Sequence, residues 1–136
     1  IQELFPSTKV KNSLELQEDE QVIEIKRLRF ADNEPIILES SFLPKSMIKN
    51  SEILQEVSSS SLYNVLAQRC DISVVRAKEA FEPVLIKEEE ARFLKTEKGK
   101  PALLLERTAF DTEGKPVEFC ISIVRGDRCR FYTELN

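Results

Sequence analysis

One hairpin decides the fold of this chain, and it reads Arg27-Leu28-Arg29-Phe30-Ala31-Asp32-Asn33-Glu34-Pro35-Ile36-Ile37-Leu38-Glu39. The residues from 21 to 30 are rich in β-branched and aromatic side chains, which favour a strand. A second strand is expected from 35 to 42, after a turn of small and polar residues. Because side chains alternate between the two faces of a strand, Arg27 and Arg29 share a face about 7 Å apart. One anion could contact both guanidinium groups.

The length of the turn determines which acidic residue joins the two arginines. If residues 31–33 form a three-residue loop with Asn33 left-handed, Phe30 pairs with Glu34, and Glu39 falls on the arginine face. A two-residue loop would put Glu39 on the other face. The three-residue loop is our expectation. The resulting face is either an ordinary solvated side of the sheet or part of an anion-binding site.

Length and composition indicate one globular, soluble domain. The chain has 136 residues, of which 41% are hydrophobic and 32% are charged, so it is long enough for one core. No apolar run approaches the roughly 20 residues of a membrane span. The net charge is −4 and no basic block stands out, which argues against nucleic-acid binding by this chain alone. The chain begins at Ile1 rather than Met, as a fragment or processed product would.

The residues that usually bind metals or act as nucleophiles are sparse. The chain has no histidine, and its three cysteines at positions 70, 120 and 129 lack the CxxC spacing. This pattern argues against a zinc site and against a histidine-based triad, so no metal or cofactor is expected. An odd number of cysteines fits a reducing cytoplasm.

A helix is expected from Ser60 to Cys70. Serine is a preferred N-cap, and Leu62, Val65 and Leu66 follow helical spacing. The backbone N–H groups and the dipole at a helix start can receive an anion. Ser61 and Tyr63 therefore either bind the same anion as the arginines or belong to a plain capped helix.

Other segments are expected as follows. Residues 7–10 begin a strand, short helical turns lie between 47 and 57, a bent strand spans 72–84, a helix spans 86–94, and a last strand spans 129–135. The Arg-Gly-Asp-Arg run at 125–128 is expected to form a tight structural turn rather than a cell-adhesion motif.

A second hairpin is expected from two strands at 101–110 and 116–124. Gly114 suits the left-handed position of a bulged turn in which Asp111 pairs with Lys115. One face is apolar and is expected to be core: Leu103, Leu105, Ala109, Val117, Phe119, Ile121 and Ile123. The other face is polar and is covered either by solvent or by a polar ligand: Glu106, Thr108, Glu118, Cys120 and Ser122. The run 109–116 echoes 29–35, which would put Glu39 and Glu118 in similar places of two related halves.

Four motifs in this order resemble the UTRA domain, the effector-binding half of HutC-subfamily GntR transcription regulators. They are the run 27–35, Ser61-Leu62-Tyr63, Gly114-Lys115-Pro116-Val117-Glu118-Phe119, and Arg125-Gly126-Asp127-Arg128. The resemblance implies that residues 1–136 form a single domain with a chorismate-lyase-like α+β fold, an antiparallel sheet flanked by helices. It also implies an upstream winged helix-turn-helix domain that this chain lacks.

The same resemblance implies a binding function rather than an enzymatic one. In family members that sense sugar phosphates, the matching residues bind the phosphate (Arg27, Arg29, Ser61 and Tyr63) and the sugar hydroxyls (Glu39 and Glu118). The expected partners are a small anionic effector, with a sugar phosphate as the best guess, a second copy of the chain, and DNA through the missing N-terminal domain. A cytoplasmic location without membrane contact is expected.

The chain departs from the family pattern in three places. Val124 stands where the family usually has a tyrosine, the segment between Val10 and Leu14 is short for the usual strand, and the usual ligand-contacting loop before Ser7 is not recognisable. Two alternatives follow. One is a dimerisation module with a degenerate pocket, and the other is a chorismate-lyase-like enzyme in which Glu39 or Glu118 would transfer a proton.

Overall fold

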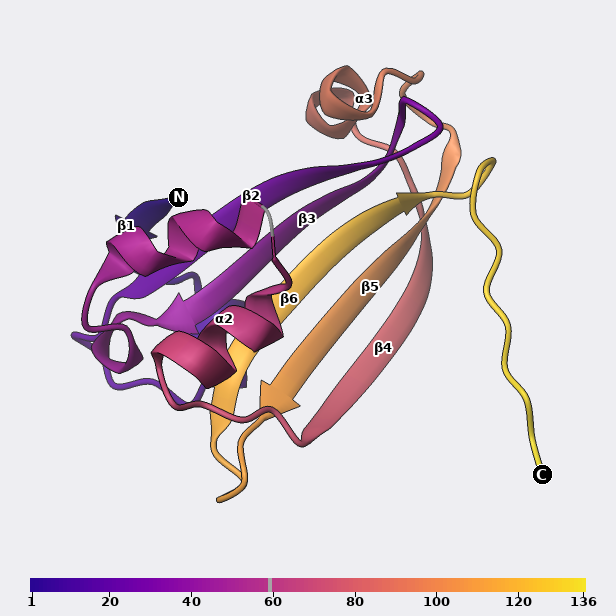
Figure 1. Ribbon diagram of the computed structural model, residues 1–136. Helices are drawn as coiled ribbons and strands as arrows, with labels where there is room; N and C mark the ends of the chain where they lie inside the picture. Colours follow the sequence, from indigo (N-terminus) through magenta and orange to yellow (C-terminus); the bar gives the residue numbers. More distant parts are fainter. Residues whose placement is uncertain (59) are drawn as a thin grey trace. The chain divides into compact units, whose positions relative to one another are not determined.

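The computed structural model describes residues 1–58 and 60–136, and Figure 1 labels its elements. In chain order they are β1 (Gln2–Leu4), α1 (Thr8–Ser13), β2 (Val22–Ala31), β3 (Glu34–Pro44), the 3-10 helices η1 (Lys45–Met47) and η2 (Ser51–Ser58), α2 (Leu62–Arg69), β4 (Arg76–Leu85), α3 (Glu88–Leu94), β5 (Pro101–Phe110) and β6 (Pro116–Arg125). The strands form one sheet in the order β1-β2-β3-β6-β5-β4. The fold is α+β, as expected, with an antiparallel sheet and a few helices.

Residue contacts divide the chain into two compact units. Strands β2 to β6 each give one end to one unit and the other end to the second unit. Unit 1 consists of Ile1–Ile25, Ser41–Glu79 and Arg107–Cys120, and unit 2 consists of Lys26–Ser40, Ala80–Glu106 and Ile121–Asn136.

The core of unit 1 forms under helix α2. This helix packs beside η2 (Figure 1), and both contribute their apolar faces. Helical spacing brings Leu62, Val65 and Leu66 into one buried cluster with Ile23 and Leu43. The expected helix is confirmed, with the bounds Leu62–Arg69 instead of 60–70, and so are the expected short helical turns.

The core of unit 2 forms under helix α3. Ala91 and Leu94 of this helix are buried with Ile123, and Leu28 and Leu38 pack against the cluster. The helix has three glutamates in its first turn, where the helix dipole favours negative charge. The expected helix in this region is therefore confirmed.

The turn of the first hairpin has two residues, so the expected three-residue loop is wrong. Asp32 and Asn33 both have positive φ, 51° and 63°, the pattern of a tight hairpin turn between β2 and β3. At the other end the N–H of Lys45 donates to the carbonyl of Gln21, N···O 3.0 Å. Between that bond and the turn, the β3 side holds one residue more than the β2 side, which requires a β-bulge.

The bulge puts Arg27 and Glu39 on the same face of the sheet, which is the arrangement that the incorrect three-residue loop had also predicted. In the register set by the Lys45–Gln21 bond, residue 27 lies opposite residue 39 and residue 28 opposite residue 38. Arg27 and Glu39 therefore share a face, whereas Leu28 and Leu38 both pack into the core of unit 2.

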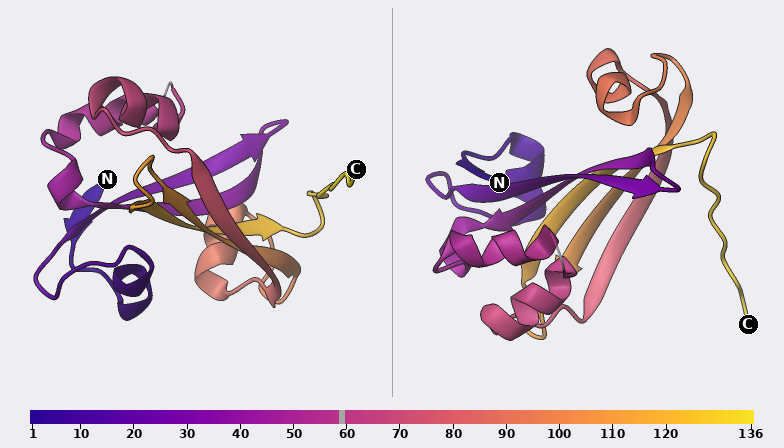
Figure 2. Two further views of the ribbon diagram at one scale, coloured as in Figure 1. Left: turned by 90° about the horizontal axis from the view of Figure 1, so that it is seen from below. Right: turned by 45° about the horizontal axis from the view of Figure 1, so that its top comes forward.

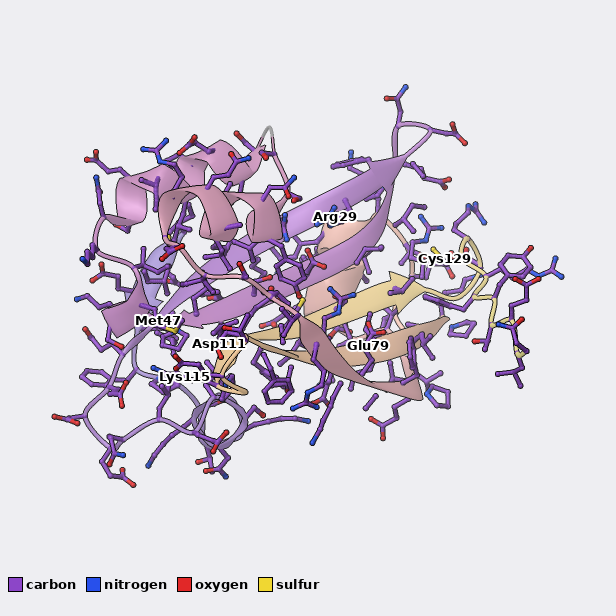
Figure 3. All side chains as sticks on the ribbon, turned by 60° about the horizontal axis from the view of Figure 1, so that its bottom comes forward. Arg29, Met47, Glu79, Asp111, Lys115 and Cys129 are labelled. Atoms are coloured by element: carbon purple, nitrogen blue, oxygen red, sulfur yellow. The ribbon has the colours of Figure 1, made fainter. Side chains whose placement is uncertain are left out.

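The second hairpin turns at Gly114, as expected. Gly114 has φ 79°, and the N–H of Asp111 donates to the carbonyl of Lys115 at 3.0 Å. Figure 3 labels both residues at this turn. At the far end the N–H of Gly126 donates to the carbonyl of Pro101, also at 3.0 Å. The β6 side again holds one residue more than the β5 side, which requires a second β-bulge.

Because of the second bulge, the prediction of the core face is wrong for part of β5. Ala102 and Leu104 of β5 pack with Ile123 of β6 in unit 2, in place of the expected Leu103 and Leu105. The bulge exchanges the two faces of β5 relative to β6 beyond the point where it occurs. Arg107, which alternation placed on the apolar face, consequently lies near Tyr63, the partner of Glu118.

The polar face of β6 is not open to solvent. Glu118 and Cys120 of unit 1 and Ser122 of unit 2 are all buried. A buried carboxylate needs hydrogen-bond partners, because an unpaired buried charge is costly. The solvent interpretation of this face is therefore wrong.

Two expected strands near the chain ends are absent. Residues 8–13 form helix α1, because Ser7 accepts a hydrogen bond from the N–H of Val10 at 3.3 Å and caps it. Residues 129–135 follow β6 without helix or strand (Figure 2). Their aromatic composition favours a strand, but these residues pair with no strand of the sheet. No helix in the described part of the chain is long and apolar enough to cross a membrane.

Candidate functional site

The expected cluster of two arginines and a glutamate is present in unit 2. Arg27 Nη2 donates to Glu39 Oε2 at 2.8 Å, and Arg29 Nε donates to the same oxygen at 3.1 Å. Ser122 Oγ donates to the other carboxylate oxygen, Oε1, at 3.3 Å. Adjacent positions on β2, β3 and β6 thus bring these polar groups together.

The charge of this cluster is unbalanced. Two guanidinium groups share one carboxylate, so the three ionised side chains carry a net positive charge. Arg29 is half exposed, whereas the side chain of Arg27 is only 20% exposed. Within the described residues, the buried Nε of Arg27 has no hydrogen-bond partner. Such a donor is uncommon in a folded protein, and an anionic ligand would satisfy it with a charge-assisted hydrogen bond.

A second polar cluster lies in unit 1, around Tyr63. The Tyr63 hydroxyl donates to Glu118 Oε1 at 2.6 Å. Arg107 lies close enough to Tyr63 for each to influence the pKa of the other, and its Nε donates to Glu79 Oε2 at 3.0 Å. Two hydrogen-bonded pairs, Tyr63 with Glu118 and Arg107 with Glu79, therefore lie together in unit 1, and their four residues come from α2, β4, β5 and β6.

This environment shifts the pKa values of Tyr63 and Arg107. Burial raises the pKa of the Tyr63 hydroxyl strongly, and the negative charge of Glu118 raises it further. Burial by itself would lower the pKa of Arg107, but interactions with Tyr63 and Glu79 raise it overall. Near neutral pH Tyr63 is therefore a neutral hydroxyl and Arg107 a cation.

Ser61 begins helix α2. Its Oγ accepts the N–H of Asn64 at 3.2 Å, which confirms the expected N-cap. The hydroxyl keeps one proton that it can donate. Its expected contact with a ligand stays a prediction. Val124, where the family usually has a tyrosine, is a buried apolar residue.

Sequence reasoning missed three of these residues. Arg107 did carry a signal, because it was a charged residue between Leu105 and Ala109 on a face expected to be apolar. Ser122 was placed on the polar face but was not assigned to the site. Glu79 gave no signal, since β4 shows no clear alternation.

The Arg-Gly-Asp-Arg run forms a structural turn in unit 2, as expected. Arg125 is buried, and its Nε and Nη2 donate to the two carboxylate oxygens of Asp127 at 3.1 Å each. Its Nη1 donates to the carbonyls of Pro35 and Leu94 at 3.3 and 3.4 Å. Arg128 donates to Glu34, with its Nε 3.1 Å from Oε2.

The model of the family described as "UTRA domain" matches residues 1–130. The chain belongs to the UTRA domain family. Similar sequences include the transcriptional repressor NagR of Bacillus subtilis, which is 36% identical over 107 residues covering 79% of this chain and 43% of that protein. A repressor of fructoselysine utilization in Escherichia coli K12 is 29% identical over 115 residues, covering 85% of this chain and 47% of that protein. The chain thus spans about half the length of these relatives.

Solved structures agree with the family. The ligand-binding domain of a GntR-family regulator from Bordetella bronchiseptica superposes with a TM-score of 0.91 at 25% identity, covering 99% of this chain and 86% of that chain. A GntR-family regulator from Enterococcus faecalis V583 shares the fold, with a TM-score of 0.89 at 24% identity and 98% and 95% coverage. This UTRA domain is therefore the effector-binding type found in GntR transcriptional regulators, and the enzyme alternative is set aside.

Proposed function

We propose that this UTRA domain senses a small anionic metabolite derived from a sugar, with a sugar phosphate as the best candidate. The observation that carries the proposal is the arginine pair of unit 2, which shares one carboxylate and has a buried, unpartnered Nε on Arg27. Two planar guanidinium groups suit the bidentate recognition of a phosphate. The E. coli relative is named for the use of fructoselysine, a sugar derivative, which supports a sugar-derived ligand.

We assign the six residues implied by the resemblance to two groups. In unit 2, Arg27 and Arg29 would bind the anionic group, while Glu39 would accept a hydrogen bond from a hydroxyl. In unit 1, Ser61 and Tyr63 would donate to the anion, and Glu118 would accept from a hydroxyl. Carboxylates that accept hydrogen bonds from hydroxyls favour the binding of a polyol and repel a second anionic group that has no hydroxyl.

The domain would regulate DNA binding by a domain outside this chain, with residues 1–136 acting as one effector domain. Effector binding changes DNA affinity only if the effector prefers one arrangement of the whole regulator over another. Repression or activation, and the operator, depend on that other domain.

A thermal-shift screen tests the effector class. Phosphorylated sugars are each compared with their unphosphorylated parents, because a ligand at about 100 times its dissociation constant stabilises the domain by about 2.7 kcal/mol. We expect a shift with the phosphorylated form only. Arg27→Ala should weaken that binding by about 1.5–3 kcal/mol, the scale of a hydrogen bond to a charged group. Arg130→Ala, at an exposed position in the C-terminal segment, is the matched control.

Two results would contradict this assignment. An Arg27→Ala variant that binds the same ligand with unchanged affinity would remove Arg27 from the site. A screen in which phosphorylated sugars, carboxylates and fatty acids all leave the melting temperature unchanged would favour the alternative of a dimerisation module with a degenerate pocket.

We further propose that the domain forms a homodimer. Strand β4 is at the edge of the sheet, and edge strands offer unpaired backbone groups to another chain. In unit 2 this edge also exposes Phe81 and Leu85, and the Phe81 ring packs edge-on against Phe131 at 5.7 Å between centroids. Phe81→Glu should therefore lower the dimer fraction in sedimentation equilibrium, while a dimer of unchanged affinity would exclude this edge.

A further inference from the structure

Glu39 takes the place of a bound anion at the arginine pair of unit 2. Its Oε2 accepts from Arg27 Nη2 at 2.8 Å and from Arg29 Nε at 3.1 Å. Its Oε1 accepts from Ser122 Oγ at 3.3 Å, and Ser122 is only 2% exposed. The side chain of Glu39 is itself only 12% exposed. In this conformation the anion that the two arginines bind is therefore a side chain of the domain itself.

The contact between Arg27 and Glu39 is not the one that suits a guanidinium group best. A guanidinium group binds an oxyanion most strongly through two parallel N–H groups. Here Glu39 accepts only from Nη2 of Arg27, while the Nε of Arg27 is buried and has no partner among the described residues. Because this Nε is closed to solvent, an effector reaches it only if Arg27 turns, and this movement changes the contact with Glu39. An effector that uses Arg27 fully therefore competes with Glu39.

An anion that takes both arginines leaves the Glu39 carboxylate short of donors. Oε2 loses the two N–H groups that it accepts from, whereas Oε1 keeps the hydroxyl of Ser122. Since Glu39 is mostly buried, water does not readily replace the lost donors, and a buried acceptor without a partner is costly. The Ser122 bond comes from β6 and the arginines belong to β2, so a movement of the arginines does not itself break that bond.

We propose that Glu39 occupies the arginine pair until the effector binds, and that Ser122, as a positioning residue, then holds the freed carboxylate toward a hydroxyl of that effector. This proposal rests on the proposed function. An anion without hydroxyls displaces Glu39 and leaves Oε2 without a donor, whereas a phosphorylated sugar supplies one. Glu39 and Ser122 thus select a phosphorylated polyol over an anion that has no hydroxyl.

The occupation of the arginine pair is tested first without a ligand. Arg29 donates through Nε, so the ¹H–¹⁵N NMR signal of this group, assigned with Arg29→Lys, reports its contact with Glu39. Glu39→Gln removes the charge that attracts both arginines, and the Arg29 signal should move. The Arg128 Nε signal is the matched control, because this group donates to Glu34 in the same unit and should stay in place. An Arg29 signal unchanged in Glu39→Gln would overturn the proposal.

Methyl phosphate and glucose 6-phosphate test the selection. Both are dianions at pH 8, because the second pKa of a phosphate monoester is about 6, but only glucose 6-phosphate carries sugar hydroxyls. Calorimetric titration gives the ratio of the two affinities, and the wild-type chain should prefer glucose 6-phosphate. Ser122→Ala should lower this preference by about fivefold, the scale of coupling between residues in contact. Glu39→Gln should lower it as well and should strengthen methyl phosphate binding, because the competing carboxylate is gone.

A purely structural role of Ser122 predicts a different result. Loss of structure would weaken the binding of both probes equally and leave the ratio of their affinities unchanged, and that outcome would overturn the role of Ser122. Ser40→Ala is the matched control, since Ser40 is a partly buried serine next to Glu39 in β3, and the ratio should stay the same in this variant. Glu39→Gln keeps the test available if Ser122→Ala does not fold.

The outcomes distinguish the two proposals. Equal affinities of the wild-type chain for the two probes would overturn the selection by Glu39 and Ser122, even though the arginines bind a phosphate. If neither probe binds the wild-type chain, the sugar-phosphate assignment and the specificity it implies both fail. The Arg29 signal in Glu39→Gln then still decides whether Glu39 occupies the arginine pair.

Discussion

Replacing Arg125 by Met should destabilise the domain strongly. Arg125 is only 4% exposed, and its guanidinium makes two hydrogen bonds with the Asp127 carboxylate and one each with the carbonyls of Pro35 and Leu94. Methionine fills a similar length but donates no hydrogen bond. The substitution therefore removes the Arg125 donors from two carbonyls and from the Asp127 carboxylate, which keeps its hydrogen bond from Arg128.

The cost can be worked out from these contacts. Each buried carbonyl left unpaired costs about 1–3 kcal/mol, and Asp127 loses less because its side chain is one-third exposed and can rehydrate. Burying the apolar Met side chain offsets part of this. The expected net loss is about 3 kcal/mol, a large share of the roughly 5–15 kcal/mol that stabilises a typical domain. For a chain of this length it corresponds to about 10 °C in Tm.

Urea and thermal unfolding followed by circular dichroism measure this loss. Arg128→Met is the matched control, because Arg128 lies in the same turn but is 45% exposed and pairs with a similarly exposed Glu34. Exposed ion pairs contribute about 0–1 kcal/mol, so this variant should lose less than 1 kcal/mol. Equal losses in the two variants, or a loss below 1 kcal/mol for Arg125→Met, would refute the structural role of the buried guanidinium.

Two further changes are expected from the same structure. The domain should lose stability as the pH falls from about 5 to 3, because hydrogen bonds from Arg128 and Arg125 lower the pKa values of Glu34 and Asp127, respectively, in the folded state. The unfolded chain binds more protons in this window, so stability rises with pH. Urea midpoints at several pH values should show this rise. If the urea midpoint changes with pH equally in Arg128→Met, Glu34 does not contribute to the effect. Ser61→Ala should cost about 1 kcal/mol through loss of the α2 N-cap, measured as a lower urea midpoint, whereas a larger effect on effector affinity than on stability would indicate direct ligand contact.

Much of the fold was predictable from local sequence. The two hairpins, helices α2 and α3 and the turn at 125–128 were expected from strand propensity, an N-cap serine and turn residues, and all are present. The ends of the chain were not predictable in this way. Residues 129–135 have strand-forming side chains but no partner strand, and residues 8–13 follow a capping serine that favours a helix.

The candidate site was only partly predictable. Alternation along one strand was enough to place Arg27 and Arg29 together, because neighbouring residues on a face depend on the local backbone alone. Their contact with Glu39 was expected from a turn that the chain does not have. It exists because β3 contains an extra residue.

The sequence by itself determined which segments become hairpins, where α2 begins, and which charged residues share a strand face. These features depend on interactions between residues close together in the chain. Only the tertiary structure decided that Tyr63 contacts Glu118 and that Arg107 contacts Glu79, since these four residues come from four separate elements. The β-bulges determine which side chains of paired strands share a face. One extra residue moves every following side chain of its strand to the opposite face of the sheet. No alternation pattern read along a single strand contains that information.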